Sequence, residues 1–258
     1  MYKIAVIGPE STGKSALTQA LARHYTSPYV DEYARDYVTN LGRPYTFNDV
    51  CEIAKIQVKA EEYIESVECF KQPSGLLPAS LPASLRSTFV FPEQLQPGSQ
   101  LREETGFHKA ARIHEETGDL ITSPLPPFVF FDTELIITKV WFEHCFGEVP
   151  DFVTHQLQKG FFDFYLVCDT DLPWEPDPVR EHGDDREYFS NWYLREIEQL
   201  EKPYVIVQGT GSERLSNAVK AIKKMIQANN TESAQESISA KAPLKRKESA
   251  LTKAYSGK

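Results

Sequence analysis

The sequence has few cysteines and no long apolar run, and each absence argues against a class of protein. Its 258 residues include four cysteines, at positions 51, 69, 145 and 168, without a Cys-x-x-Cys pair. This spacing argues against a disulfide framework and against a structural zinc site. No run of about 18 apolar residues is present, and the start MYKIAVIG lacks the layout of a signal peptide. We therefore expect a globular, cytoplasmic protein without a membrane partner.

Positive charge is also scarce. The chain carries 28 Lys and Arg against 37 Asp and Glu, a formal net charge of -9, which argues against a nucleic-acid partner. The balance reverses over residues 228–258, where six Lys or Arg stand against three Glu, a net charge of about +3. We predict that residues 1–227 form one domain and that residues 228–258 form a basic, disordered tail.

Short apolar runs alternate with helical patterns along the chain. Continuous apolar strands between helices predict an α/β fold, a three-layer α/β/α arrangement with a five-stranded parallel sheet. Ligands then bind at the carboxyl ends of the strands. The predicted strands are 3–8, 29–30, 128–132, 164–169 and 204–209, and the predicted helices are 14–24, 48–67, 134–146, 150–159, 184–201 and 212–227.

Residues 71–127 interrupt this alternation. They contain PSGLLPASLPASL and eight of the chain's 17 prolines. Because proline fixes its own φ and biases its predecessor away from the helix, we interpret the segment as a Pro-rich insertion within the domain. We expect deletion of residues 74–96 to leave the core intact.

The motif GPESTGKS, residues 8–15, fits the pattern G-x-x-x-x-G-K-[ST] between a strand and a helix. Glycines at both ends let the backbone N–H groups face phosphate, the lysine would neutralise the β and γ phosphates, and the serine would ligate Mg²⁺. ATP and Mg²⁺ are therefore the predicted cofactors. The predicted ATP-binding residues are Gly8, Glu10, Ser11, Thr12, Gly13, Lys14, Ser15 and Ala16.

Acidic residues follow two of the predicted strands. Asp132 ends FVFF and Glu134 follows it, so we predict that Asp132 organises Mg²⁺ or acts as a base; a role as helix N-cap is compatible with this. Glu32 and Arg35, in DEYAR, lie at the same sheet edge. Glu32 would bind an acceptor hydroxyl, or would simply form an ion pair with Arg35.

The segment DLPWEPDPVREHGDDR, residues 171–186, follows the fourth predicted strand and contains Arg180 and Arg186. Three prolines stiffen it, so it is suited to act as a lid that brings guanidinium groups to a transferring phosphoryl group. In the alternative reading, both arginines pair with neighbouring carboxylates on a solvated face.

Together, GPESTGKS, YVDEYARDYV, IAKIQ, FFDTELIITKVWFEHCFG and LPWEPDPVREHGDDR resemble the ribosylnicotinamide kinase domain of the NadR family and its stand-alone relatives. The resemblance covers most of the chain outside residues 71–127 and the tail. It implies a P-loop, nucleoside-kinase-like fold with a lid. It also implies transfer of the ATP γ-phosphoryl group to the ribose 5′-hydroxyl of nicotinamide riboside in NAD salvage.

By position, the resemblance implies a set of site residues. One departure is Asp31, which stands where relatives can place an aromatic residue against the nicotinamide ring. Asp132 is the first candidate for the base and Glu32 the second. The implied residues are Lys14, Asp132, Glu32, Arg180 and Arg186 for catalysis, Ser15 and Asp132 for the metal, and Glu32, Arg35, Gln57, Glu134, Lys139 and Trp141 for the substrate.

Two other functions fit the P-loop: an ATPase or nucleotide-binding regulatory module, and a kinase of another nucleoside or small metabolite. The lid arginines and the acidic strand ends favour a kinase with a small-molecule nucleoside as its partner.

Overall fold

The computed structural model describes residues 1–66, 82–91, 128–177 and 183–240. The chain divides into two units, Met1–Ala221 and Ile222–Lys258. In the second unit, the described residues form the continuation of helix α7 to Ala240. None of the helices in the described ranges combines the length and apolar character that a membrane span requires.

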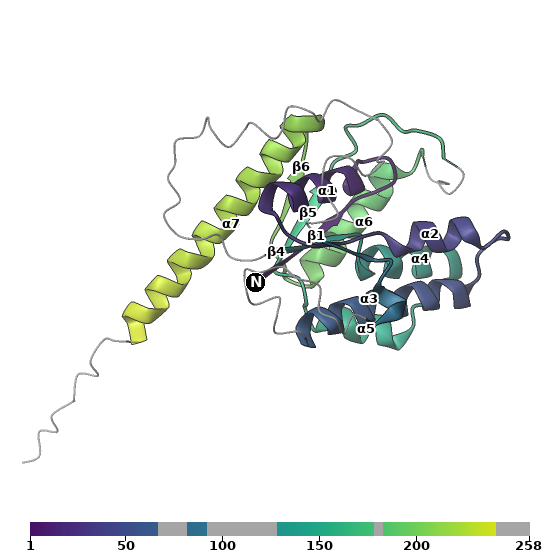
Figure 1. Cartoon of the computed structure of the whole chain (residues 1–258), viewed down its shortest axis with the longest axis horizontal. Helices are drawn as coiled ribbons and strands as arrows, with labels where there is room; N and C mark the ends of the chain where they lie inside the picture. The colour runs from purple at the N-terminus through teal and green to yellow at the C-terminus, as the bar shows by residue number, and fades with distance from the viewer. Residues whose placement is uncertain (67–81, 92–127, 178–182, 241–258) are drawn as a thin grey trace, which may run out of the picture. The chain divides into compact units, whose positions relative to one another are not determined.

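A six-stranded sheet forms the centre of the first unit (Figure 1). Its order is β3-β2-β4-β1-β5-β6, and every neighbouring pair is parallel except β2 and β3. The predicted α/β fold is confirmed, with one strand more than expected. The strands are β1 Tyr2–Ile7, β2 Tyr29–Val30, β3 Phe89–Val90, β4 Phe128–Asp132, β5 Phe164–Cys168 and β6 Tyr204–Val207.

The six predicted helices are all present, and a seventh, α2, was not predicted. Helix α2 has only eight residues and buries none of its side chains, so it is too short for its periodicity to stand out in the sequence. Helix α7 runs beyond the predicted end at residue 227, and residues 228–240 contain no Gly or Pro that would end it. The segment predicted to be disordered is thus helical as far as Ala240. The helices are α1 Lys14–Tyr25, α2 Tyr33–Asn40, α3 Phe47–Ser66, α4 Leu135–Phe146, α5 Asp151–Gln158, α6 Arg186–Gln199 and α7 Gly211–Ala240, with a 3-10 turn η2 at Ala83–Leu85.

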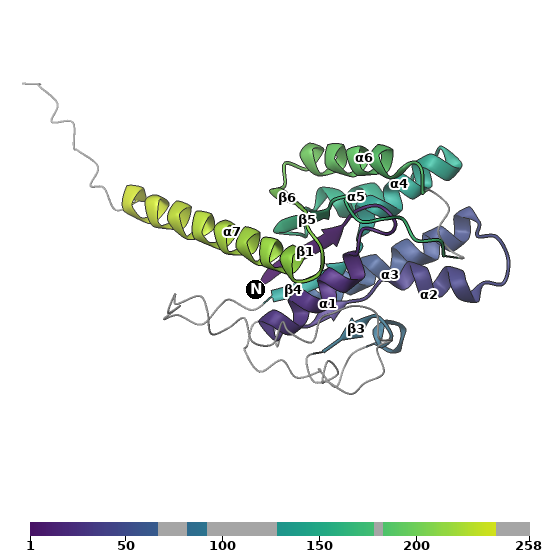
Figure 2. The ribbon, with the colours of Figure 1, turned by 90° about the horizontal axis from the view of Figure 1, so that it is seen from above.

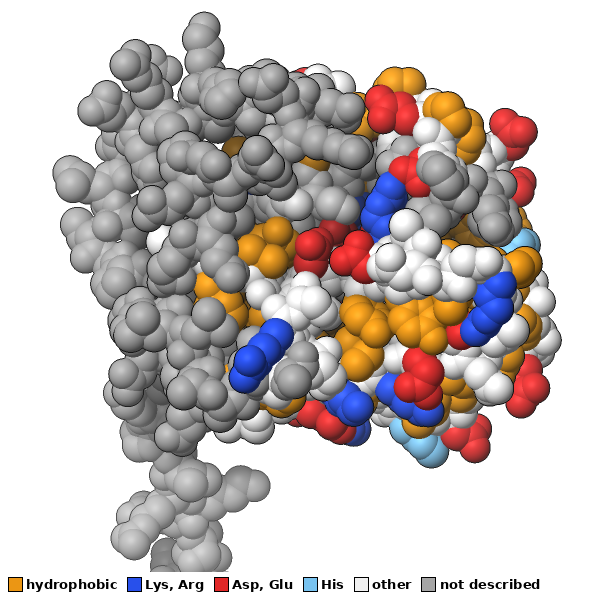
Figure 3. All heavy atoms as spheres, turned by 45° about the vertical axis from the view of Figure 1, so that its right-hand side comes forward, with side chains coloured by type: hydrophobic (Ala, Val, Ile, Leu, Met, Phe, Trp, Pro, Cys, Tyr) orange, Lys and Arg blue, Asp and Glu red, His pale blue; other side chains and the backbone are white. Residues whose placement is uncertain are grey.

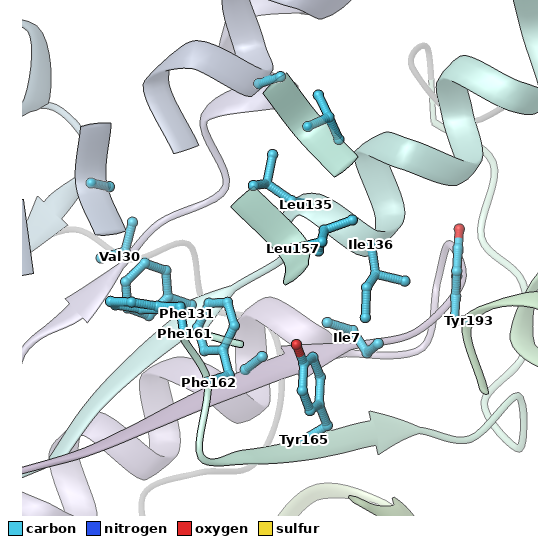
Figure 4. Close-up of a cluster of buried hydrophobic side chains, with 14 of the residues drawn as sticks. Ile7, Val30, Phe131, Leu135, Ile136, Leu157, Phe161, Phe162, Tyr165 and Tyr193 are labelled. Atoms are coloured by element: carbon cyan, nitrogen blue, oxygen red, sulfur yellow. The ribbon is translucent and has the colours of Figure 1, made fainter. Parts of the chain in front are cut away.

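The alternation of side chains along β4 separates the two faces of the sheet. On one face, Phe131 belongs to the core formed with α3, α4, α5 and α6 (Figure 4). On the other face, Tyr25 of α1 lies against Phe128 and Phe130, with ring centroids 4.6 and 5.8 Å away. The helices therefore lie on both faces of the sheet, as Figure 2 shows from above, and all five residues of β4 are buried.

The additional strand, β3, falls inside the predicted insertion. Leu85, Phe89 and Phe91 are at most 3% exposed and belong to the core. Strand β3 pairs antiparallel with β2. Because β3 has only two residues, its sequence shows no periodicity that would predict it. The expectation that residues 74–96 can be deleted without harm to the core is therefore wrong for residues 82–91. Residues 71–81 and 92–127 lie outside the described residues.

We predict that Leu85→Ala lowers the free energy of unfolding by about 2–5 kcal/mol, because a buried leucine is replaced by a cavity. Urea denaturation measures the change. The neighbouring Ser84 is exposed, so Ser84→Ala is the matched control and should change stability by less than about 0.5 kcal/mol. Equal stability of the two variants would show that this segment does not belong to the core.

Candidate functional site

The P-loop connects β1 to α1 and requires glycine at two positions. Gly8 has a φ of 148°, and a Cβ there would lie 2.8 Å from the carbonyl oxygen of Cys168. Gly13 caps α1 in the left-handed region, at φ 75°. Both positions exclude larger residues, because a side chain would be strained or would collide with β5. The sequence pattern thus has a direct steric cause.

The polar side chains of the loop fold onto its own backbone. The hydroxyl of Thr12 and the ammonium group of Lys14 both donate to the carbonyl oxygen of Pro9, at 2.8 and 2.9 Å. These bonds hold the loop in a closed curve at the N-terminus of α1. A helix N-terminus with backbone N–H groups and a lysine is an anion-binding arrangement.

A cavity of about 400 Å³ begins at this loop and extends towards α2, α4 and α6. All the predicted ATP-binding residues line it, and so do Glu32, Arg35 and Trp141. The sequence did not single out the rest of its far wall, which is largely aromatic. That wall includes Tyr45, Val140, His144, Phe189 and Tyr193.

Asp132 lies beside the P-loop because β4 pairs with β1 in parallel register, Val6 opposite Asp132. Its side chain is buried, and neither carboxylate oxygen accepts a hydrogen bond from the described residues. Burial raises the pKa of Asp132 and the charge of Glu32 raises it further, whereas the nearby Ser15 hydroxyl and Lys14 ammonium lower it. A buried carboxylate in this condition requires a proton or a cation.

Magnesium fits these donors. The Ser15 hydroxyl and the Asp132 carboxylate offer oxygen ligands next to the phosphate-binding loop. No cluster of three or more His, Cys, Asp or Glu that could hold a metal occurs in the described part of the chain. A magnesium ion here would therefore depend on phosphate oxygens for further ligands, as Mg²⁺ commonly does in nucleotide sites.

Two predicted substrate residues, Gln57 and Glu134, do not line the large cavity. They line a second, smaller cavity of about 20 Å³, together with Asp31, Glu61 and Asp132; Thr133 lines both cavities. Glu134 caps α4 by accepting a hydrogen bond from the Ile136 N–H at 2.9 Å. Gln57 accepts one from the Thr138 hydroxyl at 2.7 Å. Gln57 thus joins α3 to α4, whereas Glu134 caps its own helix.

Lys139 lines neither cavity. It pairs with Glu196 of α6 at 2.6 Å and lies 3.8 Å from Glu143 of its own helix. The ion pair with Glu196 makes Lys139 a link between α4 and α6.

The lid arginines are placed differently from one another. Arg186 begins α6 and donates to the carbonyl oxygen of Leu172 at 2.8 Å, so it holds the loop after β5 and does not line either cavity. Arg180 lies outside the described residues. A third arginine, Arg35 of α2, forms an ion pair with Asp177 of the same loop. Arg35 therefore joins the wall of the large cavity to the loop after β5.

Two groups of residues at the site could not be predicted from the sequence. One is the aromatic wall, whose members come from α4, α6 and the chain before α3, so no local motif unites them. The other is Arg214 in the first turn of α7, which donates to the carbonyl oxygen of Thr12 in the P-loop. The only signal for Arg214 was its place just after the last strand, at the carboxyl edge of the sheet.

Comparison with known families agrees with this geometry. The sequence model of a family described as an AAA domain matches residues 3–70 and 87–214, most of the chain. The chain belongs to this AAA-domain family. The match skips residues 71–86 and resumes just before β3. The last residue that the family model matches is Arg214.

Among curated proteins, the AAA domain resembles the trifunctional NAD biosynthesis/regulator protein NadR. It is 22% identical over 227 residues to the Escherichia coli (strain K12) protein and 21% identical over 228 residues to the Salmonella typhimurium protein. Each alignment covers 86% of this chain but only 42% of the relative. The chain thus spans less than half the length of these curated relatives.

Two solved structures of NadR protein are also similar. The first, a crystal structure in complex with NR, has a TM-score of 0.47 at 20% identity and covers 87% of this chain and 50% of the other. The second, in complex with NAD and AMP-PNP, has a TM-score of 0.46 at 19% identity and covers 87% and 49%.

Glu61 provides a pH-dependent prediction. It is buried, accepts a hydrogen bond from the Gln156 amide at 2.7 Å, and burial raises its pKa to about 8. The folded state therefore binds more protons than the unfolded state between about pH 4.5 and 8, and the free energy of unfolding falls as pH rises through this range. Glutamine keeps the acceptor oxygen but does not titrate.

We expect Glu61→Gln to flatten this fall, so that the variant gains on the order of a few kcal/mol relative to the wild type between pH 4.5 and pH 8. Chemical denaturation at several pH values measures it. Glu62→Gln, at an exposed neighbour, is the control and should follow the wild type. An unchanged slope in Glu61→Gln would mean that Glu61 titrates normally.

Asp132→Asn separates stability from chemistry. Without Mg²⁺, and at a pH high enough to ionise Asp132, the variant should be as stable as the wild type or more so, because the cost of a buried carboxylate is removed at constant shape. Its kcat should fall by about 100-fold or more, because the carboxylate beside Ser15 is lost. Thermal melting and ADP release measure the two effects, with Asp151→Asn at an exposed site as control. Wild-type kcat in Asp132→Asn would remove Asp132 from the reaction.

Proposed function

We propose that this domain is an ATP-dependent kinase that phosphorylates the ribose 5′-hydroxyl of nicotinamide riboside. The observation that carries the proposal is the continuity of the large cavity from the P-loop past Glu32 to the aromatic wall. Its volume of about 400 Å³ lies in the usual range for small-molecule sites. The aromatic end, apart from the phosphate-binding loop, offers a surface for the ring of an acceptor.

The acceptor end suits a planar cationic ring. Trp141 lines the cavity and packs edge-on against Tyr45, with ring centroids 4.8 Å apart. An aromatic face favours a pyridinium ion through the cation–π interaction. Asp31 lines the smaller cavity instead, so its presence in place of an aromatic residue does not bring a carboxylate to the wall around Trp141.

Each residue then has a role in phosphoryl transfer. Lys14 and the backbone N–H groups of the loop bind the phosphates, and Ser15 with Asp132 would hold Mg²⁺, which supplies charge neutralisation at the phosphate oxygens. Glu32, which lines the same cavity as the P-loop, would accept the proton of the attacking hydroxyl. The hydroxyl oxygen forms a bond to the γ-phosphorus while the bond to the β–γ bridging oxygen breaks, which releases ADP.

This assignment divides the two carboxylates by position. Asp132 is buried behind the loop beside Ser15, whereas Glu32 lines the large cavity. We therefore assign Asp132 to the metal and Glu32 to the proton.

The surface and the relatives support a small-molecule substrate. On the face in Figure 3, basic side chains of the described residues are scattered among acidic and hydrophobic ones, so a phosphate backbone would meet both signs of charge. The curated relatives' name includes NAD biosynthesis, a process in which a nicotinamide riboside kinase would take part.

ADP release and product mass test the proposal. With Mg²⁺ and ATP, nicotinamide riboside should be converted to its mononucleotide with one ADP formed per product, and ordinary nucleosides should react more slowly. Lys14→Ala should lower kcat/KM by about 100-fold or more, since the loop loses its lysine. Lys55→Ala, at an exposed lysine of α3, is the control.

ADP release without an acceptor product would support the ATPase or regulatory function instead. A different phosphorylated nucleoside would keep the kinase and change the acceptor.

A further inference from the structure

Arg214 joins three loops that are far apart in the sequence. Its side chain is only 4% exposed, and each of three nitrogens has a different partner. Nε donates to the carbonyl oxygen of Gly209 at 2.7 Å, Nη1 donates to the carbonyl oxygen of Thr12, and Nη2 pairs with Asp171. The three acceptors belong to the loop before α7, the P-loop and the loop after β5.

We propose that Arg214 is a positioning residue for ATP, which sets the orientation of the Thr12–Gly13 peptide in the P-loop. In a planar trans peptide, the carbonyl group and the following N–H point in opposite directions. Because the Thr12 carbonyl is bound to Arg214, the Gly13 N–H is directed to the opposite side, where Gly13 and Lys14 line the large cavity.

The packing around Gly13 supports this orientation. A Cβ at Gly13 would lie 3.1 Å from Cδ1 of Leu172 and 3.7 Å from Nη1 of Arg214. Arg214 and the loop after β5 thus fill the space on one side of Gly13. The Thr12–Gly13 peptide therefore has little freedom to rotate. A rotated peptide would turn the Thr12 carbonyl oxygen towards the phosphate, and the two would repel each other.

The charge of Arg214 is balanced by Asp171. One carboxylate oxygen of Asp171 pairs with Arg214, and the other accepts a hydrogen bond from the Gly209 N–H at 2.7 Å. Since the guanidinium group is neutralised and its described hydrogen bonds go to protein groups, its effect on phosphate acts through the backbone. Arg214 is therefore a positioning residue and not a catalytic one.

Direct binding of AMP-PNP with Mg²⁺, measured by calorimetry, tests the proposal. Arg214→Met should weaken binding at least tenfold, and Arg214→Lys should weaken it less, because lysine keeps the charge but not the fork of donors. Asp171→Asn should also weaken binding, since Arg214 loses its ionic partner. In steady-state assays the KM for ATP should rise by a larger factor than kcat falls.

Arg195→Met, at an exposed arginine of α6, is the matched control and should bind AMP-PNP as the wild type does. A folded Arg214→Met variant with Kd within twofold of the wild type, even with a lowered Tm, would overturn the proposal. If Arg214→Met fails to fold, wild-type Kd in both Arg214→Lys and Asp171→Asn would overturn it.

The inference rests on the proposed use of ATP and not on the acceptor. A wild-type protein that binds AMP-PNP but phosphorylates no riboside would contradict the proposed function alone. A wild-type protein that binds no ATP analogue would overturn both.

Discussion

The parallel pairing of β1 with β4 and β5 is the constraint on which the site depends. Val6 pairs with Asp132 on one side, and Ile7 pairs with Val167 on the other. Because parallel strands end at the same edge, this register sets the P-loop, Asp132 and the loop after β5 side by side. The register is itself fixed by burial, since β4 and β5 have every residue buried and a slip would displace the whole apolar set.

The same edge concentrates groups that are costly to bury. Both carboxylate oxygens of Asp132 and one of Glu134 lack hydrogen-bond partners in the described part of the chain, and burial raises the pKa of both groups. Arg214 is equally buried but is fully paired with Asp171 and two backbone carbonyls. The contrast is informative: the arginine is satisfied by the protein itself, whereas Asp132 retains oxygens for a ligand from outside.

Much of this arrangement could be predicted from the sequence, for physical reasons. Central strands such as FVFFD are continuous apolar runs, and the P-loop glycines are required by φ and by contact with Cys168, so both leave local signals. Leu85 and β3 left none, because a two-residue strand between proline-rich stretches has no period. The roles of Lys139 and Arg186 depend on partners from other elements, Glu196 and the Leu172 carbonyl, which no motif specifies.

A crystal structure of the protein with Mg²⁺, AMP-PNP and nicotinamide riboside tests the central claim most directly. The account predicts the phosphates in the P-loop, Mg²⁺ on Ser15 and Asp132, the ribose 5′-hydroxyl near Glu32, and the nicotinamide ring against Trp141. Nicotinamide riboside bound elsewhere, or a nucleotide base filling the aromatic end of the cavity, would contradict it.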